Sequence, residues 1–422
     1  MKISSEVFYQ HFGEIIVNLC LKSVNMNVET QQFISENIDK DIHQLALQSK
    51  RFPMVDLPLA IRQINGKQKI RYKVPSFYNN ENILYPVQLS LEQSSSETTA
   101  TYKSTLCEGN VLVDLTGGFG VDCFFMASHF QEVEYVERQT ELCELARHNF
   151  QVMGGNHITV INEQTEKFLY EMQQVDWIFI DPARRSTSGK KVVLLSDCEP
   201  DVSALSSLLL EKSSKVMIKL SPMMDISAAL SELPNTSEIH IISVENECKE
   251  ILFILSKIIQ NDLKVKTINF GKKKQNQIFE FELKQEATEN SIISCELGKY
   301  LYEPNAAVMK SGAFKLIGNR FNLLKLHINT HLYTSNEFEI DFPGRIFEVK
   351  SVWGNGKNEW KNEAKRLPKA NISTRNYPIG VDDLRKKLKI SDGGDNYLFA
   401  CTLANEQKVM IECKKRDIET SI

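Results

Sequence analysis

The chain has 422 residues, 42% of them hydrophobic and 25% charged, which is typical of a globular protein too long for one ordinary core. The formal net charge of -4 gives no general attraction for nucleic acid, so any such site must be a local basic patch. The first 20 residues lack a signal-peptide pattern, no run approaches the roughly 18 apolar residues of a membrane helix, and the nine cysteines form no CxxC pair. We therefore expect a cytoplasmic protein of two or three domains, without a membrane anchor or a disulfide framework.

Residues 1–90 are expected to form a helical region. Apolar residues recur at intervals of three and four over 33–48, and four prolines interrupt the part that follows. A further helix is expected at 95–106, where a serine cluster can cap its start and Glu97 lies in its first turn.

After residue 106, short β-rich runs alternate with segments of helical period. The runs lie at 111–115, 133–137, 158–162, 176–181 and 215–220. This alternation predicts an α/β fold with a parallel, doubly wound, Rossmann-like sheet over 91–262. Two further runs, 238–244 and 250–255, predict an antiparallel hairpin that closes the edge of this sheet.

Two smaller α+β units are expected at 263–337 and 338–422. The second should have three strands around a helix, at 344–352, 381–390, 397–403 and 408–413. In the first, His327 and His331 are four residues apart, the spacing of two metal ligands on one helix face. No third ligand is evident, so we expect no metal site.

Basic residues cluster at two places that could touch nucleic acid. Segment 66–78, GKQKIRYKVPSFY, mixes cations with aromatic rings, which could follow a phosphate backbone and stack on bases. The last unit adds Arg375 and the run 385–389. Such charge is also the ordinary pattern of a solvated surface, and the sequence leaves both interpretations open.

The first predicted strand ends in a glycine-rich turn. The candidate binding residues are Asp114 at the strand end, followed by Thr116, Gly117, Gly118 and Gly120. A helix that begins after such a turn can bind a ligand through free backbone N–H groups. A dinucleotide fingerprint would need a glycine where Cys123 stands. The pattern D-x-x-G-G-x-G instead suits S-adenosylmethionine, which has no pyrophosphate to hold.

The ends of the next two strands offer further contacts to this cofactor. Glu137 ends the second strand, and its carboxylate can accept hydrogen bonds from both ribose hydroxyls. Gln164 follows the third strand, where the adenine amine would lie, and its side-chain carbonyl could accept that hydrogen bond.

The segment DPARR, which contains Asp181, Pro182 and Arg184, follows the fourth strand. In folds of this kind the substrate meets the cofactor there. The glycine turn, the strand-end acid and DPARR, in this order, resemble the core of a class I methyltransferase. DPAR also resembles the [DN]PP[YFW] motif of amino methyltransferases, whose first residue holds an exocyclic amine and whose aromatic stacks on the base. Here Arg184 replaces the aromatic, and a guanidinium can stack on a base or clamp a phosphate.

The motif resembles those of two other methyltransferase chemistries. DPxR resembles the motif of uracil-C5 methyltransferases, which need a thiolate nucleophile after the fifth strand. That strand ends in KLSP without a cysteine, so C5 chemistry is disfavoured. Ribose 2′-O-methyltransferases use a Lys-Asp-Lys-Glu tetrad, and the corresponding places here hold Lys103, Asp181, Lys219 and Glu250. Because such matches are frequent by chance, the tetrad stays one alternative beside solvated or snorkelling side chains.

The chain as a whole resembles the DPARR-type class I methyltransferases of Bacteroidetes that carry a C-terminal THUMP-like domain. The matching segments include SLEQSSSETTATYK, VLVDLTGGFGVD, WIFIDPARR, IKLSPMMD, YLYEPNAAVMKSGAFKLI and TRNYPIGVDDLRKKLKISDGGDNYLFA. The resemblance implies a helical N-terminal region, a Rossmann-like core, a ferredoxin-like unit at 263–337 and a THUMP-like end at 338–422. Since THUMP domains occur in RNA-modifying enzymes, it also implies an RNA substrate, tRNA or rRNA.

These observations favour an S-adenosylmethionine-dependent RNA methyltransferase, with Asp181 positioning the methyl acceptor and Pro182, Arg184 and Lys219 beside it. A methyltransferase for a protein or small molecule, and a non-catalytic cofactor-binding or RNA-binding protein, are the alternatives. The presence of Asp181 and Lys219 argues against a non-catalytic protein. The methylated atom and the oligomeric state stay open.

Overall fold

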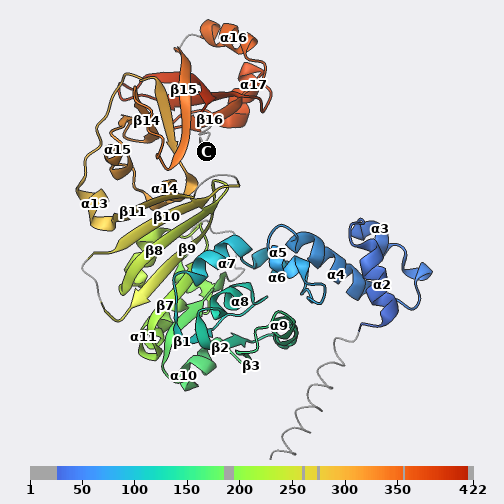
Figure 1. The fold of residues 1–422 in the computed structure, drawn as a ribbon. Coiled ribbons are helices and arrows are strands. Elements are labelled where there is room, and N and C mark those ends of the chain that lie inside the picture. Colours follow the sequence, from blue (N-terminus) through green and yellow to red (C-terminus); the bar gives the residue numbers. More distant parts are fainter. Residues whose placement is uncertain (1–25, 185–193, 259–261, 273–275, 355–356, 417–422) are drawn as a thin grey trace, which may run out of the picture. The chain divides into compact units, whose positions relative to one another are not determined.

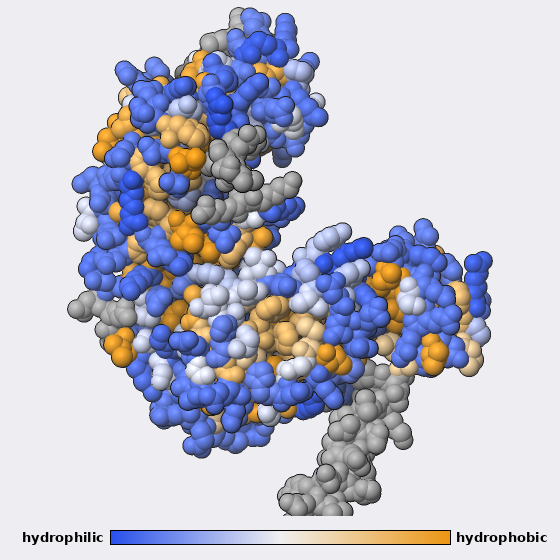
Figure 2. All heavy atoms as spheres, viewed as in Figure 1, coloured by the Kyte–Doolittle hydropathy of each residue, from blue (hydrophilic) through white to orange (hydrophobic). Residues whose placement is uncertain are grey.

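The computed structural model describes residues 26–184, 194–258, 262–272, 276–354 and 357–416 (Figure 1). Two compact units share the chain, Met1–Ser188 with Leu195–Ile218, and Gly189–Leu194 with Lys219–Ile422. Among the described residues, no helix is long and apolar enough to cross a membrane. The face drawn in Figure 2 is mainly hydrophilic, with scattered hydrophobic side chains.

The larger sheet has nine strands in the order β11-β10-β8-β9-β7-β4-β1-β2-β3. Its parallel part consists of β1 (Gly109–Asp114), β2 (Phe130–Glu137), β3 (Ile158–Asn162), β4 (Val175–Ile180) and β7 (Ser213–Leu220). The connecting helices are α8 (Val121–Ala127), α9 (Thr140–Val152), α10 (Thr165–Glu171) and α11 (Val202–Lys212). The predicted α/β class and doubly wound order are confirmed, and the carboxyl ends of β1, β2, β3 and β4 carry the candidate site.

The predicted hairpin is also present, but it does not end the sheet. It is formed by β8 (Thr236–Val244) and β9 (Glu247–Ser256), which pair antiparallel; helix α12 (Ile226–Glu232) precedes it. On the other edge of β8, β10 (Lys264–Phe270) pairs parallel, and β11 (Gln277–Glu282) then pairs antiparallel with β10. The boundary expected at 262/263 therefore falls inside the sheet. The sheet continues past this boundary because the hairpin leaves one edge of β8 open. Strand β10 covers this edge and buries Val265 and Ile268.

The described part of the N-terminal region, from residue 26 on, is helical. Its helices are α2 (Val28–Asn37), α3 (Ile42–Ala46), α4 (Leu57–Ile70), α5 (Pro75–Asn79), α6 (Gln88–Gln93) and α7 (Glu97–Ser104), with a 3-10 turn at Ser49–Arg51. Two of the prolines begin helices rather than break them, since they occupy the first turns of α4 and α5, where no N–H donor is needed. The Ser96 side chain caps α7 by accepting the Thr99 N–H at 3.2 Å.

This helical region packs against the Rossmann-like core of the first unit. The Asn149 side chain on α9 exchanges two hydrogen bonds with the Leu84 backbone, both 2.9 Å. The Phe77 ring lies 5.5 Å from the ring of Phe119, which belongs to the glycine turn. The helices over residues 26–90 are thus packed onto the core of the same unit.

A second sheet of seven strands lies in the second unit, in the order β13-β14-β12-β15-β18-β17-β16. The strands are β12 (Tyr300–Pro304), β13 (Leu324–His327), β14 (Thr330–Ser335), β15 (Gly344–Trp353), β16 (Asn371–Arg375), β17 (Asn396–Thr402) and β18 (Lys408–Lys415). The helices are α13 (Leu283–Thr288), α14 (Ala306–Ser311), α15 (Leu316–Arg320), α16 (Lys357–Arg366) and α17 (Val381–Leu388). Because β12 pairs with β15, the two expected C-terminal units share one sheet.

The histidine pair does not lie on a helix. His327 ends β13 and His331 lies on β14, across a tight hairpin. The Nε2 atom of His327 lies 3.0 Å from a carboxylate oxygen of Glu406. The His331 ring stacks on Phe314 at 3.6 Å, and burial together with Lys325 and Arg375 lowers its pKa to about 4. Within the described ranges, no group of three or more His, Cys, Asp or Glu side chains could hold a metal ion.

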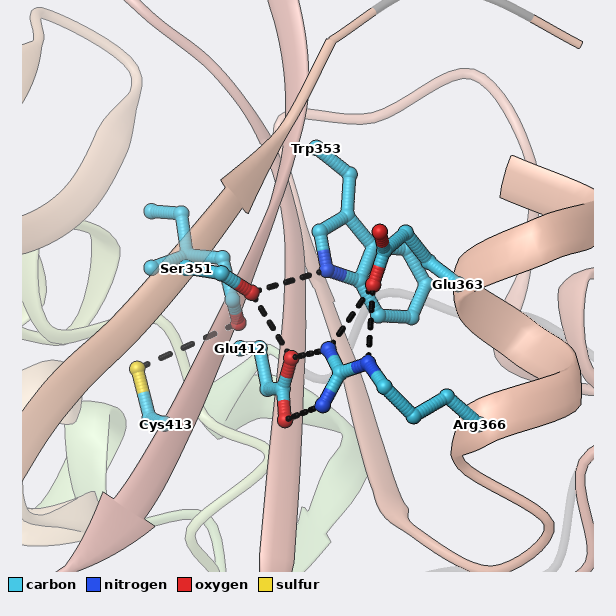
Figure 3. A network of polar contacts seen from close by, with 7 residues as sticks. Ser351, Trp353, Glu363, Arg366, Glu412 and Cys413 are labelled. Atoms are coloured by element: carbon cyan, nitrogen blue, oxygen red, sulfur yellow. Dashed lines mark hydrogen bonds and ion pairs between the residues drawn. The ribbon is translucent and has the colours of Figure 1, made fainter. Parts of the chain in front are cut away.

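A buried carboxylate attaches α16 to the second sheet (Figure 3). Arg366 at the end of α16 donates to both oxygens of Glu412 on β18, at 3.3 and 2.5 Å, and the Ser351 hydroxyl donates to Glu412 at 2.7 Å. Burial alone would raise the pKa of Glu412, but these hydrogen bonds outweigh it, and the pKa lies below its usual value. Arg366 also binds the more exposed Glu363.

We predict that Arg366→Met lowers the free energy of unfolding of this part of the second unit by about 1–3 kcal/mol at neutral pH, because it leaves a buried carboxylate short of donors. The folded-state pKa of Glu412 is depressed, so this stabilisation is present above the usual value of 4.5 and is lost as the pH falls through the folded-state pKa. The difference between variant and wild type should therefore shrink in acid. Urea unfolding followed by tryptophan fluorescence measures it, since Trp353 and Trp360 lie beside the network.

Glu363→Gln is the matched control. It removes only the exposed partner of Arg366 and should change the stability by less than about 0.5 kcal/mol. Equal losses in the two variants, or a loss for Arg366→Met that does not depend on pH, would contradict the assignment.

Candidate functional site

The glycine turn between β1 and α8 is shaped by two aromatic rings beneath it. Gly118 and Gly120 have φ angles of +56° and +83°, which residues with side chains rarely adopt. A Cβ atom on Gly117 would lie 2.1 Å from the ring of Tyr135, and one on Gly120 would lie 2.8 Å from the ring of Phe150. Gly117 and Gly120 therefore let the backbone lie directly on buried aromatic side chains, and Gly118 is required for its positive φ angle.

The amide groups of these glycines donate to protein acceptors rather than lying free for a ligand. Gly117 donates to the Val136 carbonyl at 3.0 Å, Gly118 to the Glu137 carboxylate at 3.0 Å, and Gly120 to the Gly117 carbonyl at 2.9 Å. The expectation that a helix start binds the ligand through free N–H groups therefore concerns the first turn of α8 and not these three glycines. The use of the glycine N–H groups within the protein keeps the turn rigid, and the turn contributes a fixed backbone surface.

Glu137, at the end of β2, is a buried carboxylate with two N–H donors. Gly118 donates to Oε2 at 3.0 Å and Gln139 to Oε1 at 2.8 Å, and the residue is only 8% exposed. A carboxylate has roughly four lone pairs to offer, so Glu137 keeps acceptor capacity beyond the two donors that the described residues supply. Ribose hydroxyls are donors that could bind to these remaining lone pairs of Glu137.

Asn162, at the end of β3, was not singled out from the sequence. Its side-chain amide donates to the carbonyls of Glu137 and Arg138 at 2.8 and 3.0 Å, and its Oδ1 accepts the Thr140 hydroxyl at 2.8 Å. It therefore holds the backbone that carries Glu137. Its position at a strand end, beside the acid at the end of the neighbouring strand, was the available signal.

Asp181 directly follows β4 and adjoins the glycine turn. Its backbone N–H donates to the Thr116 hydroxyl at 2.6 Å, and the Thr116 N–H in turn donates to the buried Asp114 carboxylate at 3.0 Å. The structure thus brings together the predicted residues Asp114, Thr116 and Asp181 at the carboxyl edge of two adjacent strands. Pro182 is buried.

The rest of the DPARR segment forms a short hairpin strand, β5 (Ala183–Arg184), which pairs antiparallel with β6 (Cys198–Glu199). The Arg184 side chain and the whole of Arg185 lie outside the described residues. Cys198 is buried on β6. Arg138, next to Glu137, binds Glu199 at 2.5 Å, which links this hairpin to the end of β2.

Gln164 lies at the start of α10 with an exposed side chain. Its backbone N–H donates to the Glu163 carboxylate at 3.0 Å. The next residue, Thr165, donates its hydroxyl to the Leu115 carbonyl at 2.8 Å and so ties α10 to the turn. The side chain of Gln164 is available for a ligand contact.

The four residues of the proposed tetrad are placed as follows. Lys103 on α7 is fully buried, and its ammonium lies 3.1 Å from Asp122 Oδ1 in the first turn of α8. Ser95 bridges the pair, because it accepts from Lys103 at 3.2 Å and donates to Asp122 at 2.7 Å. Lys219 on β7 and Glu250 on β9 are 8% and 6% exposed. Sequence reasoning missed Ser95 and Asp122 as the partners of Lys103.

Comparisons with known proteins match the whole chain and its C-terminal parts. Family models of a ferredoxin-like domain and of a THUMP domain-like region match residues 300–343 and 344–415. A search of curated proteins found no match. The crystal structure of a candidate methyltransferase from Porphyromonas gingivalis W83 is 32% identical, covers 92% of this chain and 98% of its own, and has a TM-score of 0.83.

Other matched structures cover a smaller share of this chain. An rRNA methylase from Streptococcus thermophilus is 12% identical over 38% of this chain and 95% of its own, with a TM-score of 0.30. A candidate methyltransferase from Streptococcus mutans in complex with S-adenosylhomocysteine is 12% identical over 38% of this chain and 97% of its own, with a TM-score of 0.29. At these TM-scores the two structures carry no weight for the activity of this chain.

We predict that Gly117→Ala destabilises the first unit by about 1–3 kcal/mol or more, because the new methyl group overlaps the Tyr135 ring. Thermal unfolding measures the loss. A second substitution, Tyr135→Leu, removes the ring and should make the cost of Gly117→Ala smaller than in the wild-type background. A full, additive cost in the double variant would show that the ring is not the obstacle.

Proposed function

Because the chain belongs to the class I methyltransferase family that carries ferredoxin-like and THUMP-like C-terminal domains, we propose that it transfers a methyl group from S-adenosylmethionine to RNA. The proposal assigns the glycine turn, Glu137 and Gln164 to the cofactor and Asp181 to the methyl acceptor. S-adenosylmethionine supplies an electrophilic methyl group on a sulfonium, so the protein has to bind it, align an acceptor with it and exclude water.

One observation carries the assignment of the site. The hydrogen bond from the Asp181 N–H to the Thr116 hydroxyl joins the start of DPARR to the glycine turn at 2.6 Å. A substrate group that is held by Asp181 would therefore lie next to whatever the turn holds. This is the adjacency that methyl transfer requires, because the acceptor has to approach the methyl carbon from the side opposite the leaving sulfur.

The chemistry of the donor set fits S-adenosylmethionine. Glu137 is buried, ordered by two N–H donors and still able to accept from the ribose hydroxyls. The turn has no room for a Cβ atom at Gly117, and its backbone is fixed against Tyr135. Gln164 offers a carbonyl to the adenine amine, and the buried Asp114 side chain accepts the Thr116 N–H at the start of the turn.

RNA is favoured as the substrate class by the THUMP domain-like match over 344–415 and by the basic and aromatic segment at 66–78. Asp181 can hold either a base amine or a ribose hydroxyl. A base amine would use its carboxylate and the next carbonyl as acceptors. A ribose hydroxyl would be held by the Asp181 carboxylate, with Lys219 on β7, the strand next to β4, as the second polar group. These two acceptors define the experiments below.

We predict that Glu137→Gln weakens the binding of S-adenosylhomocysteine about tenfold, because a charged acceptor for the ribose hydroxyls is replaced by a neutral one. Isothermal titration calorimetry on the full chain measures it. Glu132→Gln, on the exposed amino-terminal half of the same strand, is the matched control and should bind like the wild type. Unchanged binding by Glu137→Gln would remove Glu137 from the cofactor site.

We predict that Asp181→Ala lowers methyl transfer at least about a hundredfold while S-adenosylhomocysteine still binds, because the acceptor loses the group that positions it. The assay is transfer of a tritiated methyl group to total RNA and to protein extract from a strain that lacks the gene. Label in protein alone would contradict the RNA substrate, and full activity of Asp181→Ala would contradict the role of Asp181.

Nucleoside mass spectrometry of the labelled RNA then separates the two acceptors. For a base amine, Asp181→Asn should keep part of the activity, since an amide oxygen can still accept the hydrogen bond. For a ribose hydroxyl, a 2′-O-methyl nucleoside should appear, and Lys219→Ala should abolish it.

A further inference from the structure

We propose that Lys67 on helix α4, Arg71 and Tyr72 in the turn after it, and Tyr78 on helix α5 form a docking surface for single-stranded RNA. This α4–α5 patch belongs to the first unit, the same unit as the glycine turn and Asp181. The proposal rests on the proposed function, and it adds the place where the RNA strand would be held.

The patch is locally basic in a chain with a net negative charge. Residues 57–80 contain five lysines and arginines and no aspartate or glutamate. Lys67 and Arg71 are four residues apart, one turn of helix, and therefore lie on one face. Phosphate groups are attracted to such a stripe, whereas the chain as a whole does not attract them.

The cations of the patch are held on aromatic rings rather than in buried ion pairs. The Lys67 ammonium lies 5.6 Å from the centre of the Tyr78 ring, and the Arg71 guanidinium lies 5.3 Å from the same ring and 5.9 Å from that of Tyr72. Arg71 also binds Asp39 at 3.1 Å, but both side chains are solvent-exposed, so water and salt weaken the pair. Both cations remain accessible to a phosphate.

Two neighbouring lysines show the contrast. Lys69 binds Glu92 at 2.6 Å, and Lys73 donates to the carbonyls of Leu91 and Glu92 at 2.7 and 2.9 Å. These two attach α6 to α4 and have a structural role. The basic residues of 57–80 therefore have different roles. Lys67 and Arg71, which lie beside aromatic rings, are the two that can bind a ligand.

The Tyr72 ring does not pack into the core of the unit. It is 88% exposed, although tyrosine usually buries much of its ring. Its neighbour Tyr78 is half-buried, with its ring between Lys67 and Arg71. A base can stack on an exposed ring while its phosphate contacts the adjacent cations, which is the usual combination in single-strand binding.

The patch is fixed to the cofactor side of the unit. Phe77, the residue before Tyr78, is fully buried, and its ring lies 5.5 Å from that of Phe119 in the glycine turn. The Asn80 amide donates to the Val152 carbonyl at the end of α9 at 3.1 Å. An RNA strand on the patch would thus be held at a set position relative to the turn.

The basic residues of the second unit are used differently. Arg375 binds the buried Glu303 at 2.6 Å, and Lys387 lies 5.1 Å from the Trp360 ring, which is buried and presents no open face to a base. These contacts fasten strands and helices together. We therefore place the docking surface at the α4–α5 patch rather than at 375–389.

The test is fluorescence anisotropy with the full chain and a labelled 12-nucleotide oligouridine RNA, at a series of salt concentrations. The double variant Lys67→Ala/Arg71→Ala should bind about tenfold more weakly or worse. Its slope of log affinity against log salt should be less steep by about 1.4, or 0.7 for each lost phosphate contact. Tyr72→Ala should bind about tenfold more weakly with an unchanged slope, since it removes stacking and no charge.

The matched controls come from the same unit. Lys215→Ala removes an exposed lysine that also lies over an aromatic ring, 5.1 Å from Trp177, on the amino-terminal part of β7. Tyr170→Ala removes a tyrosine that is 67% exposed on α10. Both should bind the RNA like the wild type, and every variant should bind S-adenosylhomocysteine like the wild type.

Wild-type affinity in the patch variants, or equal losses in the controls, would overturn the docking surface while leaving RNA methylation intact. A wild-type protein that neither binds the oligonucleotide nor labels RNA would instead overturn the proposed function, and the docking surface with it.

Discussion

The candidate site depends on the contact between the glycine turn and Tyr135. The ring of Tyr135 occupies the space where a side chain at position 117 would lie, and its hydroxyl donates to the Gly118 carbonyl at 2.5 Å. Burial, with the charges of Glu137 and Asp114 nearby, raises the pKa of Tyr135 well above its usual value, so the hydroxyl stays protonated and keeps donating. Tyr135 on β2 thus determines the position and the orientation of the turn that follows β1.

That contact also determines what the glycines can do. Their N–H groups donate to Val136, Glu137 and Gly117, so these three glycines contribute a fixed backbone shape rather than free donors. The same arrangement orders the Glu137 carboxylate, because the Gly118 N–H is one of its two donors. A buried carboxylate needs such donors to stay charged, and here the turn supplies one before any ligand is bound. The turn and the ribose-binding candidate therefore support each other.

Much of the architecture could be predicted from the sequence because it follows from local patterns. The β-rich runs and the turn at 114–120 predicted the parallel, doubly wound sheet and the positions of Asp114, Glu137 and Asp181 at strand ends. Two kinds of feature could not be predicted. The pairing of β10 with β8, like the single sheet shared by β12 and β15, is decided by which edge is open in three dimensions. The tight hairpin between His327 and His331 mimics the helical spacing of four, so spacing alone could not separate the two structures.

Lys103 illustrates the same limit at the level of chemistry. The position of Lys103 ahead of the first strand matches the first lysine of the tetrad, yet its ammonium is fully buried against Asp122 and Ser95. Removing one partner from a buried pair leaves an uncompensated charge and costs about 3–5 kcal/mol, so a stabilising role explains this lysine without any reaction. Asp122 lies in the first turn of α8, whereas Lys103 lies on α7 and Ser95 lies just before α7. The pair therefore also attaches α8, the helix that follows the glycine turn, to α7. Substitution of Lys103 would lower methyl transfer whether this lysine holds the glycine turn in place or acts on the substrate. Only loss of the first role would also lower thermal stability and weaken S-adenosylhomocysteine binding, and loss of the second would leave both nearly unchanged.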